Sequence, residues 1–286
     1  MKNISIKFLL VVFKTYLSNL PKSIKVLLLI NIVVYFIFII TDWVFSYDLN
    51  YIFGAYPTCS EKFRVYGIFT YMFTHNKNLD HIIGNLIFFL LFAPAVSRVI
   101  GDKNTIKLYI FSGLITFLSF NYIENNTHNK IADKLTKTGF DVKKIKQDNH
   151  GYIKMSTFNN TNETQKILID LYNNTNTETN GASGSILGFM IIYPFLFIKR
   201  KKSILLNLIV LYFVIDITLM VINTVIYHDL DELGTTFGHL GGVIGGIVFF
   251  IVWLLYLKNK SVNYLFTENK KVIQNEAAPI LQINAS

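Results

Sequence analysis

Charged residues are scarce in this chain of 286 residues. Lys, Arg, Asp and Glu make up 16% of it, whereas roughly 25% is usual for a soluble domain. Hydrophobic residues make up 52%, and several long apolar stretches account for the excess. These proportions exclude a soluble globule, a coiled coil and a disordered protein. We therefore expect the chain to fold in a lipid bilayer.

Cysteine is almost absent, since the sequence has Cys59 alone. A single cysteine cannot form a disulfide within the chain, and no set of Cys and His stands at the spacing of a structural zinc site. The H-E-x-x-H pattern of zinc proteases is missing as well. We expect no metal and no cofactor.

The apolar stretches predict an all-α membrane protein with six spanning helices. A hydrocarbon core of about 30 Å needs roughly 20 apolar residues in a helix, and six stretches come close to that length. The expected spans are Ile24–Ile40, His81–Val99, Thr105–Ile123, Ser183–Ile198, Ile204–Ile226 and Phe237–Leu257.

Basic residues predict the orientation of the helices. Sixteen of the 27 Lys and Arg lie in residues 1–25, in the turns after the second and fourth helices, and in the C-terminal tail, whereas the short loops opposite hold three. Positive residues stay cytoplasmic, so both termini should be cytoplasmic, in a plasma (inner) membrane. The net charge of +9 then reflects topology, and we expect the bilayer rather than nucleic acid as partner. Nothing in the sequence indicates an oligomeric state.

Polarity divides the chain into three parts. Residues 1–23 should be a cytoplasmic or interfacial segment, 24–257 the membrane domain, and 258–286 a cytoplasmic tail. A polar stretch at about 124–180, rich in Asn, Thr and Lys, separates the third and fourth helices. It holds no spanning segment, so we expect an extracytoplasmic insertion that is partly disordered or forms a small capping module.

Three polar side chains should share one depth in the membrane, where such groups are costly. Ser183 stands 16 residues before the basic residue Lys199, which is about 24 Å of helix and less than the hydrocarbon thickness. His81 and His239 stand 17 and 19 residues from the basic ends of their own helices. Asn85 follows His81 by four residues and projects from the same helix face. We expect one polar layer beneath the extracytoplasmic surface.

Small residues beside this layer favour close contact between helices. Gly242 and Gly246 follow His239 by three and seven residues, and such spacing lets helix backbones approach closely in lipid. Gly184 and Gly188 offer a matching groove on the serine helix. Close approach is what a hydrogen bond between a serine and a histidine requires. The free N–H groups at the start of the serine helix would suit a developing oxyanion.

With these motifs the sequence resembles the rhomboid family of intramembrane serine proteases. The shared motifs are HxxxN in the second helix, GxSG at the fourth and HxxGxxxG in the sixth, formed by His81, Asn85, Gly181, Ser183, Gly184, His239, Gly242 and Gly246. The stretch Tyr109–Gly113 in the third helix also looks like the family. The resemblance covers about residues 24–257, apart from the insertion.

The resemblance implies a rhomboid-like bundle of six helices with a catalytic dyad of Ser183 and His239. It also implies an oxyanion site formed by His81, Asn85 and the backbone N–H of Ser183. The reaction would be hydrolysis of peptide bonds in or near the transmembrane segments of single-pass or multi-pass membrane proteins. The four glycines of the motifs would serve helix packing.

Two features depart from the family pattern. Rhomboids often carry Trp-Arg in the first extracytoplasmic loop, where this chain has Tyr66-Gly67. The link between the third and fourth helices is usually short, whereas here it is the long polar insertion.

Two other functions stay open, and a third is excluded. A rhomboid-like protein without activity would bind membrane clients, and loss of the serine or histidine would favour it. A transporter would show polar residues along its spans or inverted repeats, and neither is seen. An aspartyl protease needs two carboxylates in its core, whereas Asp216 is the one acid within an expected span.

Overall fold

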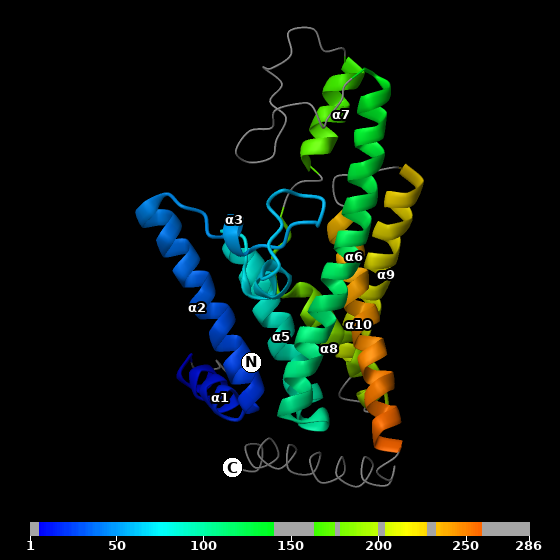
Figure 1. Cartoon of the computed structure of the whole chain (residues 1–286). Coiled ribbons are helices and arrows are strands. Elements are labelled where there is room, and N and C mark those ends of the chain that lie inside the picture. Colours follow the sequence, from blue (N-terminus) through cyan, green and yellow to red (C-terminus); the bar gives the residue numbers. More distant parts are fainter. Residues whose placement is uncertain (1–5, 140–162, 175–177, 200–203, 228–232, 259–286) are drawn as a thin grey trace, which may run out of the picture.

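The structure is a computed structural model of the chain and describes residues 6–139, 163–174, 178–199, 204–227 and 233–258 (Figure 1). Within these ranges the regular structure is helical, apart from one isolated bridge between Ala55 and Thr179. In lipid, backbone N–H and C=O groups must be satisfied within the protein, and a helix does this within one segment. The expected fold class, an all-α membrane protein, is confirmed.

Four helices are long and apolar enough to cross a bilayer. They are α2 (Lys22–Phe45), α5 (Leu79–Ile100), α6 (Asp102–Lys137) and α10 (Leu233–Lys258). Two more apolar helices, α8 (Ser183–Phe197) and α9 (Ile204–Tyr227), have shorter apolar stretches among the described residues. The chain is thus a multi-pass integral membrane protein, while the count of six spans stays a prediction.

Short helices occupy both ends of α2. The N-terminal helix α1 (Ile6–Ser18) lies near the start of α2 and carries exposed Val and Phe side chains (Figure 1). Beyond the other end of α2, the connection to α5 contains α3 (Asn50–Phe53), α4 (Gly67–Thr70) and the short 3-10 helix η1 (Tyr71–Phe73). We call this connection, residues 46–78, the α2–α5 loop.

The third span is the first part of a longer helix. Helix α6 continues to Lys137, whereas the expected span ended at Ile123. Past the apolar stretch, its residues Ile131 and Leu135 are buried against α7 (Glu163–Asn174), which lies in the expected insertion. The hydrogen-bonded ladder of a helix needs no lipid, so an apolar stripe that packs on α7 lets α6 extend beyond its long apolar stretch. The part of the insertion at 140–162 lies outside the described residues.

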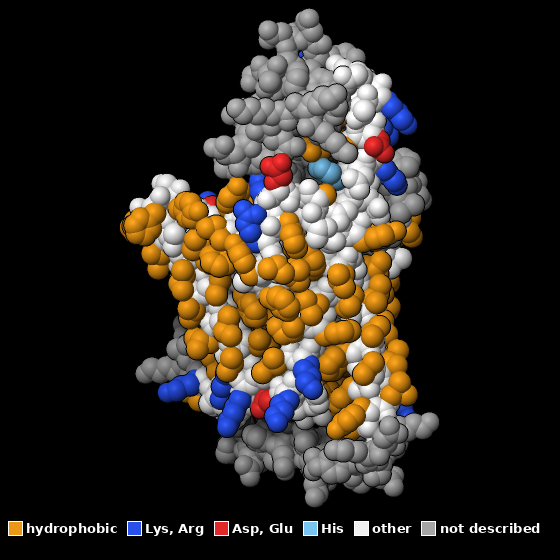
Figure 2. Space-filling view, viewed as in Figure 1, with side chains coloured by type: hydrophobic (Ala, Val, Ile, Leu, Met, Phe, Trp, Pro, Cys, Tyr) orange, Lys and Arg blue, Asp and Glu red, His pale blue; other side chains and the backbone are white. Residues whose placement is uncertain are grey.

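Basic side chains mark one end of the bundle. Ser23 at the start of α2 hydrogen-bonds Asp102 at the start of α6 through both its N–H and its hydroxyl, at 2.9 and 2.6 Å. Arg98 at the end of α5 donates to the Asn19 carbonyl at 3.2 Å. Figure 2 shows a wide hydrophobic belt with Lys and Arg gathered along this edge, as in a bilayer-spanning protein.

Helices α6, α8 and α10 approach one another through glycines. A Cβ atom on Gly242 of α10 would lie 2.4 Å from the carbonyl oxygen of Gly184. A Cβ on Gly246 would lie 2.7 Å from the Cα of Gly188, one turn further along. The Cβ positions of Gly184 and Gly188 themselves face the Thr116 and Ser112 side chains of α6. The predicted groove of α10 therefore faces the backbone of α8, whereas the glycines of α8 make room for α6, and the α8 and α10 backbones nearly touch.

Candidate active site

Ser183 is the first residue of α8 and sits at a sharp change of backbone direction. Two residues earlier, Gly181 has φ +116°, which side chains of L-residues rarely allow. The Gly181 N–H donates to the Tyr71 carbonyl at 2.9 Å, which ties this turn to η1. The Ser183 hydroxyl is thereby presented at the N-terminus of a helix, where backbone N–H groups lack partners within the helix.

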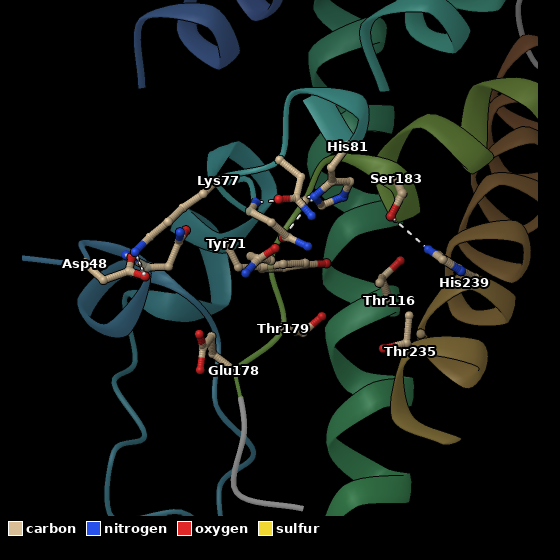
Figure 3. A pocket seen from close by; sticks show the side chains of 16 residues that line it. Asp48, Tyr71, Lys77, His81, Thr116, Glu178, Thr179, Ser183, Thr235 and His239 are labelled. Atoms are coloured by element: carbon tan, nitrogen blue, oxygen red, sulfur yellow. Dashed lines mark hydrogen bonds and ion pairs between the residues drawn. The ribbon is translucent and has the colours of Figure 1, made fainter. Parts of the chain in front are cut away.

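His239 meets the serine from α10. Its Nε2 atom lies 2.9 Å from the Ser183 Oγ atom, within hydrogen-bond distance (Figure 3). The preceding Gly238 lies next to Thr116 and Phe120 of α6, so α10 sits close to α6 as well as to α8. The sequence placed the serine and this histidine in one layer, and the structure brings the two side chains together.

His81 reaches the same turn from the start of α5. Asn76 contacts the His81 Nδ1 atom with its side-chain oxygen at 3.0 Å and its backbone N–H at 3.3 Å. The other ring nitrogen, Nε2, faces Gly181, because a Cβ atom there would lie 2.9 Å from it. Any side chain at position 181 would therefore push against His81.

Asn85 stands one helical turn beyond His81 and is buried. Its side-chain nitrogen donates to the His81 carbonyl at 3.0 Å and lies 3.9 Å from the point where a Gly181 Cβ would be. His81 and Asn85 therefore both border the turn that presents Ser183. Of the predicted site residues, the structure gathers the serine, both histidines, the asparagine and Gly181 around this turn, with Gly184 and Gly242 packed behind it and Gly246 one helical turn further away.

His75 supports His81 from below the surface of the α2–α5 loop. It is 2% exposed, and its ring lies edge-on to the His81 ring with 5.3 Å between centroids. Burial, helped by the nearby His81, lowers the pKa of His75 to about 4. His75 is therefore neutral at physiological pH. Its backbone carbonyl accepts a hydrogen bond from the Asn50 side chain at 3.1 Å, which holds this part of the loop in place.

A pocket of about 550 Å³ opens over these residues. Ser183, His81 and His239 line it, together with parts of the α2–α5 loop and the segment 178–181. Asp48, Lys77 and Glu178 also line it and lie away from the dyad (Figure 3). The pocket is large enough for several residues of an extended peptide.

The family-like segment Tyr109–Gly113 of α6 is bonded to η1 by two tyrosines, one from each element. Tyr109 donates to the Met72 carbonyl at 2.8 Å, and Tyr71 donates to the Gly113 carbonyl at 2.6 Å. Together they fasten η1 to α6, and the Gly181 turn is bonded to η1. At the position where rhomboids often carry Trp-Arg, Gly67 packs closely on Gly54, since a Cβ would lie 2.8 Å from the Gly54 carbonyl oxygen.

Sequence reasoning missed the segment that leads into Ser183. Thr179 pairs with Ala55 through two backbone hydrogen bonds of 2.9 and 2.8 Å, so residues 178–181 run in extended form along the pocket. Within an Asn- and Thr-rich stretch, neither periodicity nor turn chemistry distinguishes these residues from their neighbours. A possible signal was their position, because whatever immediately precedes the serine must lie beside it.

A comparison with protein families gives the site its context. The family model of the rhomboid domain matches residues 62–139 and 150–256, which is more than half of the chain and includes all the predicted site residues. Searches of curated proteins and of solved structures found no match. Rhomboid proteins are generally intramembrane serine proteases, although the family includes inactive members. This chain, with its apolar helices and the matched domain, belongs to the rhomboid family.

Proposed function

We propose that the protein is an intramembrane serine endopeptidase that hydrolyses membrane-protein substrates through a Ser183–His239 dyad. The observation that carries the proposal is the 2.9 Å contact between the serine hydroxyl and His239 Nε2 at a pocket. A nucleophile hydrogen-bonded to a base is the arrangement that covalent catalysis requires. The rhomboid match adds the class of reaction.

The reaction would proceed through an acyl-enzyme. His239 Nε2 takes the proton from Ser183 Oγ as this oxygen attacks the scissile carbonyl carbon. The imidazolium then gives its proton to the leaving amine when the tetrahedral intermediate collapses. His239 then takes a proton from a water molecule, which attacks the ester. When the ester breaks, the imidazolium gives this proton to Ser183 Oγ.

The oxyanion would form beside the Gly181 turn. His81 Nε2, the Asn85 side-chain amide and the Ser183 backbone N–H would donate to it. The closeness of Gly181 to the first two groups supports this assignment. Donors aimed at a developing charge in a dry site are each worth about 3 kcal/mol in other hydrolases.

The arrangement in the membrane follows from the same proposal. The basic edge of the bundle would face the cytoplasm, which puts both termini there and the pocket near the opposite surface. Residues 24–257 would then form the membrane domain, and α7 and the end of α6, although part of this range, would project from the bilayer as the polar insertion. Substrates would be transmembrane segments whose ends unfold into the pocket.

The test is cleavage of a single-pass reporter by the purified protein in liposomes. Ser183→Ala and His239→Ala should each lower kcat by at least about 1,000-fold. Ser185→Ala is the matched control, because this serine lies on the same helix and its buried hydroxyl has no hydrogen-bond partner among the described residues. Cleavage that survives both dyad substitutions would reject the dyad.

The same assay separates the competing function. If the wild-type protein binds the reporter with no detectable cleavage, and the dyad variants bind it equally well, the chain is a client-binding member of its family. Serine-directed fluorophosphonate labelling decides the point independently, because an activated Ser183 should react and the unactivated Ser185 should not.

A further inference from the structure

The pocket carries an excess of negative charge at the end away from the dyad (Figure 3). Lys77 is the basic side chain in this part of the lining, and two carboxylates already hold it. Its amine lies 2.8 Å from Asp42 and 3.3 Å from Asp48. The hydrogen bond to Asp42 raises the pKa of Lys77, so this cation is already paired with carboxylates. The Glu178 carboxylate has no ion pair among the described residues.

The structure fixes Glu178 where it can act on a bound peptide. The bridge between Thr179 and Ala55 holds its backbone in the extended segment beside the pocket. Its Cβ and Cγ pack over Gly54, where a side chain would come within 3.0 Å of them. Tyr56 donates its hydroxyl to Glu178 Oε2 at 3.1 Å. The carboxylate is thus anchored by a neutral donor and directed by packing.

Neighbouring cations leave this carboxylate without an ion pair. Among the described Lys and Arg, none has its charged nitrogen within 4 Å of the Glu178 carboxylate, because both ion pairs of the described residues belong to Lys77. Lys62 contacts the ring of Tyr56, with 5.2 Å from its amine to the centroid, rather than the carboxylate. A charged group in a partly enclosed pocket is stabilised by a partner of opposite sign, which a basic side chain of a bound peptide would supply.

Asn50 supplies a second, independent observation. It lines the same pocket, is 5% exposed, and its side-chain oxygen accepts no hydrogen bond from any described residue. Its backbone N–H donates to the Asp48 carboxylate at 2.9 Å, so Asn50 stands at the acidic end of the pocket. This end therefore offers the Glu178 carboxylate, which has one neutral donor, and the Asn50 amide oxygen, which has none among the described residues. A lysine ammonium carries three donors and an arginine guanidinium five.

We propose that Glu178 forms a subsite for a lysine or arginine side chain of the substrate. The inference rests on the proposed protease function for the position of the scissile bond, and it names a substrate class that this function leaves open. Glu178 precedes Ser183 by five residues, which an extended chain spans in at most about 17 Å. A substrate in extended form has the same rise, so the basic residue lies within about five positions of the cleaved bond.

The test places one lysine at each of the five positions on either side of the cleavage site of the reporter. Each lysine reporter is compared with the same reporter carrying glutamine. At one or two adjacent positions we expect lysine to lower KM about tenfold relative to glutamine, as for a charge-assisted hydrogen bond. Glu178→Gln keeps the shape and the Tyr56 contact and should abolish this preference. Glu61→Gln, at an exposed acid of the α2–α5 loop that does not line the pocket, should leave it intact.

A binding measurement keeps the subsite separate from catalysis. The same reporters are titrated onto Ser183→Ala protein in nanodiscs, where Kd is measured with no cleavage. The lysine reporter should bind about tenfold more tightly than its glutamine partner, and adding Glu178→Lys should reverse the order in favour of a glutamate reporter. Rising salt should reduce the preference.

Two outcomes would overturn the inference. One is a scan in which no position favours lysine in either assay. The other is a lysine preference that Glu178→Gln and Glu178→Lys leave unchanged. If wild type cleaves nothing while the preference appears in the binding assay, the proposed function fails and the subsite stands.

Discussion

Two groups of helices differ in how closely they pack. In the group formed by α6, α8 and α10, glycines bring backbones so close that a Cβ on Gly242 would collide with Gly184. Between α8 and α9 the contacts are made by large apolar side chains, and a groove of about 460 Å³ remains, lined by residues that include Pro194, Asn207 and Leu211. Both dyad residues belong to the first group.

The difference indicates which parts of the molecule must be precise. A hydrogen bond between Ser183 and His239 tolerates changes of only a few tenths of an ångström, and the two residues come from separate helices. Lipid supplies no hydrophobic force between helices, so close backbone contact has to hold them. Helix α9 has no part in the dyad and can be attached by dispersion contacts alone.

After the dyad itself, the largest effect should come from the donors beside the Gly181 turn. His81→Ala and Asn85→Ala should each lower kcat about 100- to 1,000-fold, because each removes a donor that acts on the transition state. Thermal unfolding of both variants should stay close to that of wild type. Steady-state kinetics on the reporter check this, and a change in KM with normal kcat would contradict the assignment.

Glycines inside and outside the tight group should respond in opposite directions. Gly242→Ala should lower the free energy of unfolding by about 2 kcal/mol or more, because the new methyl group must displace the backbone of α8. Gly84→Ala is the matched control on α5, where a Cβ has nothing within 4 Å. It should be neutral or stabilise by about 0.5 kcal/mol, as alanine favours helix. Unfolding in SDS measures both, and equal effects would undermine the comparison.

The loop that supports His81 should make the protein sensitive to acid. Because the pKa of folded His75 lies at about 4, below the ordinary 6.5, folding favours its neutral ring. The stability that this contributes is present above pH 6.5 and is lost as the pH falls toward 4. Between pH 7 and pH 5 wild type should therefore lose about 2 kcal/mol more than His75→Gln. Parallel pH profiles of the two proteins would show that His75 titrates normally.

The smallest effect is expected on α9. Ile217→Ala should cost about 1 kcal/mol, because α9 is held by side-chain contacts alone and can move to close the gap around this 6% exposed side chain. Ile192→Ala in α8 removes the same atoms from a site that is 1% exposed and should cost about 3 kcal/mol. Denaturation curves of the pair give the difference, and a larger loss for Ile217 would reverse the comparison.

Helix geometry and the spacing of residues in the sequence were enough to predict much of the site. The rise of a helix is fixed and basic residues mark one membrane surface, so the levels of Ser183 and His239 could be worked out separately for each helix. Their side chains hydrogen-bond in the structure. Glycine spacing also indicated the face of α10 that meets α8, whereas the glycines of α8, which we expected to face α10, face α6. Catalytic roles for these residues stay predictions.

Other features depend on contacts that no local pattern encodes. Helix α6 extends past Ile123 because Ile131 and Leu135 find partners on α7, some thirty residues later in the chain. Glycines toward α6, such as Gly245, look in the sequence like those toward α8, since the partner helix decides their use. The position of Glu178 beside the pocket, on which its proposed role as a subsite depends, is set by the pairing of Thr179 with Ala55.

The most direct test of the account is the activity of the Ser183→Ala/His239→Ala double variant measured beside each single variant. If the two residues act as one unit, each single variant should be as slow as the double variant, within about threefold, because removing either partner disables the other. Losses that multiply, so that the double variant is slower than each single by the other's full factor, would mean that serine and histidine act independently and would contradict the dyad.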